Sequence, residues 1–324
     1  MNSPTAADMP MSYLQAFGLK ASQVLPLTWG LLLISLAVIA VVSVLLVRGL
    51  FRSPKTTVDG PDSAPVERPV AGTSRITIGV GISAFVLFLS AVWTMATLAQ
   101  IGRPPQEPAF TVEVIGHQWW WEIRYLSDQP ARNFTTANEI HIPVGETVAV
   151  KLISRDVIHS FWVPALGGKT DLIPGQTNVT WMEADKPGVY RGQCAEYCGL
   201  QHAHMALTVV AQEPEAFEAW RAGQLEPASE ANTERVQAGL TAFIQKCGIC
   251  HTVRGTRAQG IVGPDLSHLM ERRTLAAGTL PNTPGNLAGW IADPQHVKPG
   301  NFMPQPEISA VELQRILAFL ETLE

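Results

Sequence analysis

Residues 194–205 read Cys194-Ala-Glu-Tyr-Cys-Gly-Leu-Gln-His-Ala-His-Met205 and gather two thiols, two imidazoles and a thioether into one short stretch. Soft sulfur ligands with imidazole select copper or zinc, and a thioether favours copper. A structural zinc site would need four closed Cys or His ligands. One further histidine, His159, lies upstream within residues 155–164. Because two thiolates can bridge two metal ions, the stretch predicts a two-copper centre; a disulfide between Cys194 and Cys198 is the alternative.

The residues around this stretch predict an all-β domain. From Arg103 to Ala211, apolar and polar positions alternate in short runs that are separated by Pro and Gly. This pattern is typical of a β-sandwich or barrel. The clearest runs are residues 111–115, 147–153, 178–181 and 206–210. We therefore expect the candidate metal ligands to lie on a β domain over 103–211.

Composition excludes several classes of protein. The 324-residue chain is 46% hydrophobic and only 16% charged, against about 25% charged in an average soluble domain. Its net charge of −5 disfavours nucleic-acid binding. Its four cysteines are too few for a disulfide-rich secreted scaffold.

The missing charges point to a membrane anchor. Residues 21–47 and 76–102 contain no Asp, Glu, Lys or Arg. A helix that crosses a bilayer needs about 20 apolar residues. We expect an N-terminal tail and transmembrane helix hairpin over 1–102, with spans at about 24–47 and 76–99. Two buried helices of a soluble protein, or a cleaved signal peptide at the first stretch, fit these lengths less well.

Basic residues between the spans set the expected topology. The N-terminal tail carries only Lys20, and Arg103 follows the second span. The connection is richer in positive charge, with Arg48, Arg52, Lys55, Arg68 and Arg75. The positive-inside rule places this connection in the cytoplasm. The N-terminus and everything after Gly102 are then expected on the outer, periplasmic face of a bacterial plasma membrane.

A second chemical motif, Cys247-Gly-Ile-Cys-His251, is the signal for covalent attachment of haem. Its thiols would bond the haem vinyl groups, and its histidine would bind the iron. A redox dithiol or half of a zinc ribbon is the alternative. Candidates for the sixth ligand are Met303, in a Pro-bounded loop, and Met270, His268 and His296. We interpret His268 and His296 as surface histidines.

The C-terminal region has a helical period. Apolar residues from Val236 to Cys247 share one helix face, and Ser309 with Glu312 has the spacing of a capping box. We expect an all-α domain over 233–324. Residues 212–232 are rich in glutamate and contain two prolines, which predicts a short helix followed by a solvated acidic linker.

These motifs resemble subunit II of the haem-copper cytochrome c oxidases. The resemblance extends to the caa-type, in which a class I cytochrome c domain is fused to subunit II. It implies a multidomain, membrane-anchored chain with an all-β cupredoxin-like sandwich that holds the binuclear copper centre Cu(A). The family pattern Cys-x-Glu-x-Cys-x-x-x-His-x-x-Met is met at every position of residues 194–205.

The resemblance also implies a role for each matching residue. Cys194 and Cys198 would bridge the coppers, with His159 and His202 as terminal ligands. Met205 would be a weak ligand, and Glu196 would supply its backbone carbonyl. The Glu196 side chain would reach a magnesium ion shared with subunit I. His204 lies two residues past the family's ligand position and is not expected to bind copper.

Two further roles come from the same resemblance. In Gly116-His-Gln-Trp-Trp-Trp-Glu122, Trp119 would be the residue through which electrons enter. If this segment is one strand, Trp119 and Trp121 share a face and Trp120 does not. In the haem domain, His251 and Met303 would be the axial pair, and the Pro264 carbonyl would orient the His251 ring.

The chain is not expected to reduce dioxygen by itself. All eight histidines lie at His117 or beyond, so the two spans cannot hold a buried haem and copper. The resemblance implies electron transfer from cytochrome c or another respiratory donor through haem c and Cu(A) to subunit I. That subunit would carry haems and a third copper and reduce dioxygen to water with proton pumping; subunit III would be a further partner.

Three alternatives are left open. The chain could be the Cu(A) and haem c subunit of another respiratory reductase, such as nitric oxide reductase. It could be a quinol oxidase subunit II with a metal-free β domain, although the intact ligand set argues against this. A copper chaperone would need no haem.

Glu67 is the only acid near the start of the second span, where the family often places a proton-feeding glutamate.

Overall fold

The computed structural model describes residues 11, 13–52, 70–229 and 231–324. It divides into two compact units, Met1–Ser22 with Pro104–Glu324, and Gln23–Arg103. Glu67, Lys55 and Arg68 lie outside the described residues.

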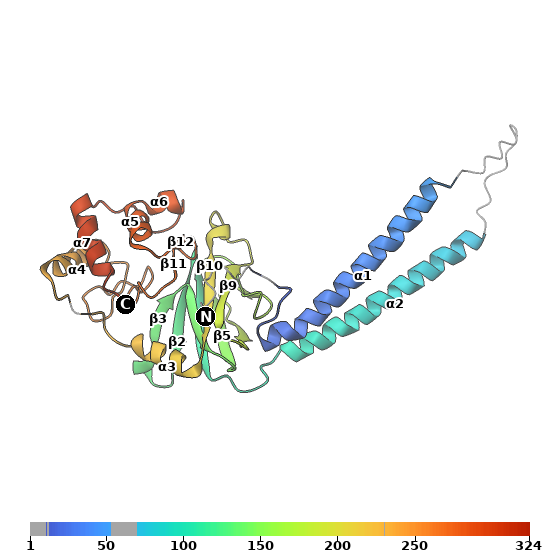
Figure 1. Ribbon diagram of the computed structural model, residues 1–324, viewed down its shortest axis with the longest axis horizontal. Coiled ribbons are helices and arrows are strands. Elements are labelled where there is room, and N and C mark those ends of the chain that lie inside the picture. The colour runs from blue at the N-terminus through green and yellow to red at the C-terminus, as the bar shows by residue number, and fades with distance from the viewer. Residues whose placement is uncertain (1–10, 12, 53–69, 230) are drawn as a thin grey trace. The chain divides into compact units, whose positions relative to one another are not determined.

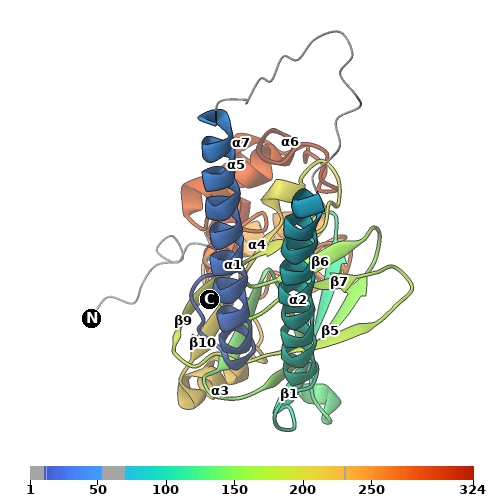
Figure 2. The ribbon, with the colours of Figure 1, turned by 90° about the vertical axis from the view of Figure 1, so that its right-hand side faces the viewer.

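The smaller unit is built from the helices α1 (Leu19–Leu50) and α2 (Val70–Ile101), which run alongside each other (Figures 1 and 2). At 1.5 Å per residue, 32 residues exceed the roughly 30 Å hydrocarbon core of a bilayer. The most apolar window of each helix is 0% buried. A core helix of a soluble protein would bury this surface, so both helices are suited to lipid. Gly30 packs directly against the ring of Trp93.

A β-sandwich forms the first part of the larger unit (Figure 1). One sheet has the order β3-β2-β1-β5-β8 and the other the order β4-β10-β9-β6-β7. The strands of the first sheet are β1 (Phe110–His117), β2 (Trp120–Leu126), β3 (Phe134–Ala137), β5 (Val148–Ser154) and β8 (Asn178–Met182). Those of the second are β4 (Glu139–Pro143), β6 (His159–Trp162), β7 (Thr170–Leu172), β9 (Gly188–Cys194) and β10 (Ala206–Gln212). The predicted all-β cupredoxin-like sandwich is confirmed.

The sandwich core follows from strand alternation. In β5, Val148, Val150 and Leu152 are fully buried and alternate with partly buried residues. Tyr125 of β2 bridges the two sheets: its hydroxyl donates to the carbonyl of His141 in β4 (2.8 Å) and accepts from the His141 amide (2.6 Å). Burial raises the pKa of Tyr125, so the hydroxyl stays protonated.

The region expected to be a linker contributes to this core. Helix α3 (Pro214–Gly223) inserts Phe217, which is 2% exposed, into the sandwich cluster. Its ring stacks on Phe110 at 5.2 Å between centroids. The short helix is therefore present where the sequence predicts one, and it packs on the β domain.

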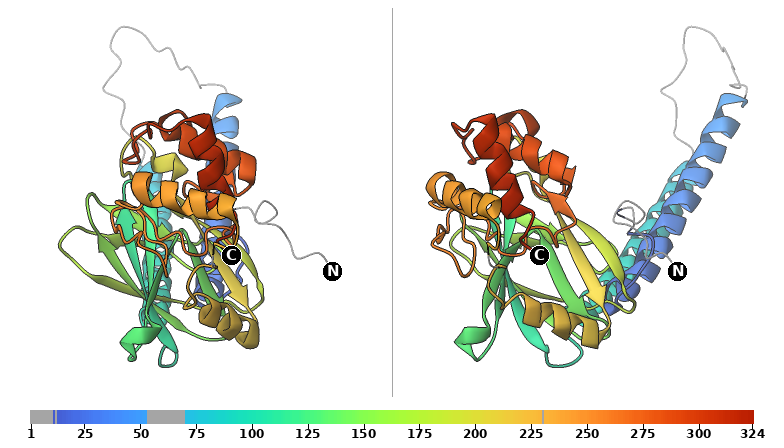
Figure 3. Two further views of the ribbon diagram at one scale, coloured as in Figure 1. Left: turned by 90° about the vertical axis from the view of Figure 1, so that its left-hand side faces the viewer. Right: turned by 60° about the vertical axis from the view of Figure 1, so that its left-hand side comes forward.

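The C-terminal part is helical, as predicted. It contains α4 (Glu234–Lys246), α5 (Pro284–Ala292), α6 (Pro294–Val297) and α7 (Ala310–Leu320), with a small hairpin of β11 (Thr274–Leu275) and β12 (Leu280–Pro281). The side chain of Thr233 caps α4, and Ser309 with Glu312 forms the predicted capping box of α7. Figure 3 shows α4 in orange against α7 in red.

Gly239 lets α4 and α7 approach closely. A Cβ atom at this position would overlap the carbonyl oxygen of Arg315 and lie 2.9 Å from the Cβ of Phe319. We expect Gly239→Ala to destabilise the haem domain by about 2 kcal/mol or more, because a packed core tolerates added methyl groups poorly. Thermal unfolding of the purified holoprotein, followed by haem absorbance, measures the loss.

Gly289 in α5 is the matched control. A Cβ there would meet no atom within 4 Å, so Gly289→Ala should be neutral or slightly stabilising. Equal melting temperatures for the Gly239→Ala variant and the parent protein would contradict the close packing of α4 on α7.

Candidate metal centres

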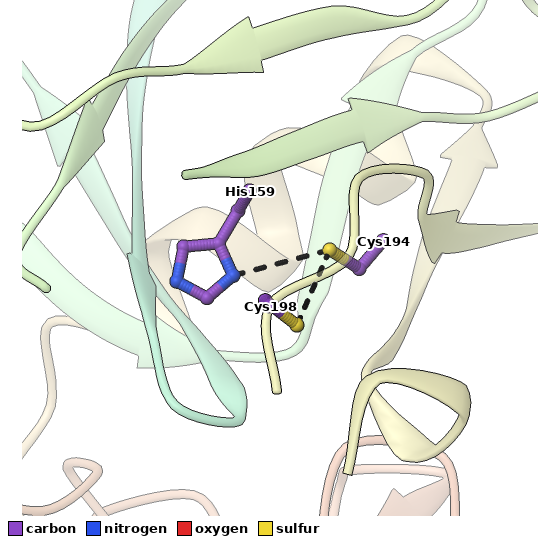
Figure 4. A group of neighbouring side chains, drawn as sticks. All are labelled: His159, Cys194 and Cys198. Atoms are coloured by element: carbon purple, nitrogen blue, oxygen red, sulfur yellow. Dashed lines mark hydrogen bonds between the residues drawn. The ribbon is translucent and has the colours of Figure 1, made fainter. Parts of the chain in front are cut away.

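The copper candidates converge at one end of the sandwich. His159 begins β6 and Cys194 ends β9, and these strands are paired through Phe161 and Cys194. The loop from β9 to β10 then carries Cys198, the short 3-10 helix η2 (His202–His204) and Met205. Figure 4 shows His159, Cys194 and Cys198 pointing toward one another.

The distances within this group are short. The two sulfurs, Cys194 Sγ and Cys198 Sγ, lie 3.7 Å apart, and both thiols are free. Cys194 Sγ is 3.9 Å from His159 Nδ1 and 3.2 Å from the Glu196 carbonyl oxygen. Cys198 Sγ is 3.5 Å from His202 Nδ1 and 3.8 Å from Met205 Sδ. The structure thus brings all six predicted copper ligands together around a pair of sulfurs.

The electrostatics of the pair favour a thiolate. The hydrogen bond between the two sulfurs lowers the pKa of the Cys194 thiol to about 4 despite its burial. The same bond, together with burial, raises the pKa of Cys198, so this thiol keeps its proton. Binding of soft metal ions would release that proton, because the metal ligand is the thiolate.

Asp156 fixes one imidazole and was not anticipated from the sequence. Its Oδ1 lies 2.7 Å from His159 Nε2, and its Oδ2 accepts the Gln118 amide at 2.7 Å. Burial lowers the pKa of His159, but its hydrogen bonds to Asp156 and Cys194 outweigh burial and raise it overall. The ring is therefore held with Nδ1 toward the sulfurs. The carboxylate three residues before His159 was the available signal.

His204 and Glu196 have other partners. His204 is exposed, and its Nδ1 lies 2.7 Å from Gln201 Oε1, so it does not join the sulfur cluster. The half-exposed Glu196 carboxylate forms an ion pair with Lys169 at 3.1 Å. Only the carbonyl of Glu196 faces Cys194.

Trp119 lies in a turn, so the prediction of one strand through 116–122 is wrong. Strand β1 ends at His117 and β2 begins at Trp120. The Trp119 ring is 7% exposed, and its Nε1 donates to the Cys198 carbonyl at 2.8 Å. Trp121 is fully buried in the sandwich core, and Trp120 stacks on His117. No Gly or Pro occupies positions 118–119, so these residues carry no local signal for a turn.

The haem candidates surround a cavity of about 220 Å³. Its lining includes both free thiols of the motif, together with His251, Met303 and apolar residues. The Pro264 carbonyl lies 2.8 Å from His251 Nδ1, which leaves Nε2 free for iron. Burial lowers the pKa of His251, and a neutral imidazole is the ligating form. The donors and the apolar cavity fit a covalently bound haem.

The other sixth-ligand candidates lie elsewhere. Met270, His268 and His296 are absent from the described lining of this cavity. His296 is exposed, as expected. The interpretation of His268 as a surface histidine is wrong: it is 7% exposed, with Nδ1 2.9 Å from the Glu324 carbonyl. This contact joins residues 56 positions apart, so the local sequence does not reveal it.

Comparisons with known proteins agree with both halves of the larger unit. Residues 125–212 match the family model "Cytochrome C oxidase subunit II, periplasmic domain", and residues 236–324 match "Cytochrome c". "Cytochrome c oxidase subunit 2" of Alkalihalophilus pseudofirmus is 35% identical over 90% of this chain and 86% of its own length. The protein of the same name from Bacillus sp. strain PS3 is 31% identical over 74% of this chain and 70% of its own.

Solved structures give a further comparison. The periplasmic domain of subunit II of cytochrome oxidase from Bradyrhizobium japonicum is 32% identical. The match covers 37% of this chain and 95% of that one, with a TM-score of 0.35.

A cupredoxin-like sandwich with a sulfur and imidazole cluster, joined to a c-type cytochrome and two apolar helices, defines an electron-transfer subunit of a respiratory oxidase. The chain belongs to the cytochrome c oxidase subunit 2 family. It is therefore an oxidoreductase component of a terminal oxidase, of the kind with a fused cytochrome c domain.

Proposed function

We propose that this chain accepts electrons from a cytochrome c or another respiratory donor at a covalent haem c. They pass through a binuclear Cu(A) centre to subunit I, where dioxygen is reduced to water with proton pumping. The strongest support is the convergence of two thiols, two imidazoles and a thioether. Each of these donor atoms lies within 4 Å of a cysteine sulfur of the group. The same chain carries the haem-attachment motif.

The copper pair would be held by residues of β6, of the end of β9 and of the β9–β10 loop. Cys194 and Cys198 would bridge the two ions, because thiolate sulfurs carry enough charge to serve both. His159 and His202 would be terminal ligands, and Met205 and the Glu196 carbonyl weak ones. The bound pair would supply a one-electron carrier in an environment from which water is largely excluded, since both cysteines are 2% exposed.

The haem would be held by Cys247 and Cys250 through thioether bonds, with His251 and Met303 as axial ligands. Pro264 orients the His251 ring through its carbonyl. A thioether ligand raises the iron potential, which suits a carrier close to an oxygen-reducing enzyme.

Two residues have proposed roles beside the ligands. The Trp119 Nε1 donates a hydrogen bond to the carbonyl of Cys198, which supports a role for Trp119 in conducting electrons to the copper site. The Glu196 side chain is proposed to reach a magnesium ion at the boundary with subunit I. Lys169 would then have to release it, since the two are ion-paired.

Membrane placement completes the proposal. Helices α1 and α2 would cross a bacterial plasma membrane, with the connection in the cytoplasm and the larger unit on the outer face. In the lipid, they would pack beside subunit I, with subunit III as a further partner.

Purification of the intact complex from membranes tests the function. We expect copurification with a multi-span subunit that carries haems and reduces dioxygen, and a haem stain that stays with this chain on a denaturing gel. Copurification with a reductase that consumes nitric oxide but not dioxygen would contradict the oxidase assignment. A chain that keeps no haem on the gel would contradict the covalent haem c.

A further inference from the structure

The haem cavity is bounded by both parts of the larger unit. Besides residues of the haem domain, its lining includes Gln118, Trp119, Trp120 and Asn138 of the sandwich. The Trp119 turn therefore closes one side of the cavity that would hold the haem. Gly300 allows the approach, since a Cβ at this position would already lie 3.2 Å from Leu200 and 3.8 Å from the Trp119 ring.

Lys298 lies at the centre of this contact. It is 2% exposed, and its Nζ donates to the carbonyls of Trp119 (2.6 Å), His204 (2.7 Å) and Ala276 (3.0 Å). An ammonium group has three N–H donors, so each one has an acceptor. Two acceptors belong to the sandwich and one to the haem domain. Burial lowers the pKa of Lys298 to about 7, while the three carbonyls favour its charged form.

The same chain segments connect the two candidate centres. Lys298 and Met303 belong to one short loop, Lys298-Pro-Gly-Asn-Phe-Met303. On the sandwich side, Gln201 Nε2 donates to the Pro299 carbonyl at 2.8 Å, and the Ala206 amide donates to Ala277 at 3.0 Å. Gln201 and Ala206 flank the segment that carries His202 and Met205. The loop with the proposed iron ligand is therefore bonded directly to the loop with the proposed copper ligands.

The contribution of the Lys298 hydrogen bonds to the contact between the two domains follows from their burial. A buried ammonium group whose acceptors are lost, or a set of buried carbonyls whose donor is removed, destabilises the structure through each group left unpaired. Removal of Lys298 would leave the carbonyls of Trp119, His204 and Ala276 without this donor. The closed arrangement of the two domains would lose stability relative to arrangements in which water reaches these groups.

We propose that Lys298 is a positioning residue that holds the haem domain on the Trp119 turn, so that electrons pass within the chain from haem to copper. This inference rests on the proposed function. Each transfer would move one electron, so that the haem would be oxidised and the copper pair would be reduced by one electron. No proton or group is transferred. Because Trp119 is 7% exposed, an external donor delivers its electron to the haem and not to the tryptophan.

Lys298→Met in the intact, metal-loaded complex tests the proposal. A flash triggers a photochemical reductant that reduces the haem. The electron transfer from haem to copper is then followed by the absorbance of both centres. We expect transfer to slow by about tenfold or more, because displacements on the order of 1 Å disturb reactive geometry strongly. The haem and copper spectra and reduction of the haem by external donor should stay unchanged. Hydrogen exchange should accelerate at the Ala206 amide and at the Arg273 amide, which donates to Glu139 across the same interface.

Lys186→Met is the matched control, since Lys186 is an exposed lysine of the sandwich; it should match the parent in both measurements. If Lys298→Met does not accumulate, Lys298→Gln keeps a polar group and should shift both measurements in the same direction. Transfer within twofold of the parent, with unchanged exchange, would overturn the role of Lys298. A parent complex in which no electron passes from haem to copper would instead overturn the proposed function.

Discussion

Replacement of Cys198 by serine is expected to abolish turnover with dioxygen, while haem c is still reduced by the external donor. Cys198 contacts three other donors of the cluster: Cys194, His202 and Met205. A serine hydroxyl is a hard ligand that is not deprotonated at neutral pH, so it cannot bridge two copper ions. Electron transfer would therefore stop after the haem and before subunit I.

The size of this effect should be large. Loss of a partner outside the ligand shell typically costs 10–100-fold in metal affinity or activity, so loss of a bridging ligand should cost more than about 100-fold. Oxygen uptake and stopped-flow reduction of the haem, recorded on the same purified complex, separate the two steps.

His204→Ala is the matched control for the copper site. Its imidazole is exposed and bonded to Gln201, away from the sulfurs, so turnover should stay close to that of the parent. Persistent oxygen consumption by the Cys198→Ser variant would remove the copper site from the electron path.

Replacement of Met303 by alanine is expected to lower the reduction potential of the haem by on the order of 100 mV. Axial ligands set haem potentials over a wide range, and a thioether stabilises the ferrous form. Met303 lines the haem cavity, and the surrounding loop is held by Asn301 and Gln295 through the Met303 amide and carbonyl. Potentiometric titration of the haem absorbance in the purified complex measures the shift.

Met270→Leu is the control for the sixth ligand. Met270 packs against the core of the haem domain and does not line the described cavity. Leucine conserves its volume, so the potential should not move. A potential that shifts in this variant, and stays constant in the Met303→Ala variant, would reassign the axial ligand.

Local patterns predicted the fold well where spacing carries the physics. The alternating run at 111–115 falls within β1, and all but the first residue of the run at 147–153 lie in β5. The Ser309 and Glu312 spacing forms the capping box of α7. Cysteine and histidine spacing likewise selected residues that the structure gathers within residues 194–205, and the family resemblance separated His202 from His204. Each of these signals lies within about a dozen residues, so the sequence displays it directly.

Features that depend on distant segments could not be predicted. The buried His268 ring contacts the Glu324 carbonyl, 56 residues away, and the buried Phe217 ring stacks on Phe110. Lys298 looks like an ordinary surface lysine until the structure places it among carbonyls more than 90 residues away for Trp119 and His204. Burial of a charged group by tertiary contacts has no local signature.

The central claim is that two copper ions share the sulfurs of Cys194 and Cys198. Electron paramagnetic resonance of the purified, oxidised complex tests it most directly. We predict one unpaired electron spread equally over two copper nuclei, with two coppers bound for each covalent haem. A spectrum in which the unpaired electron couples to a single copper nucleus would contradict the claim, as would a chain with intact thiols that binds no copper.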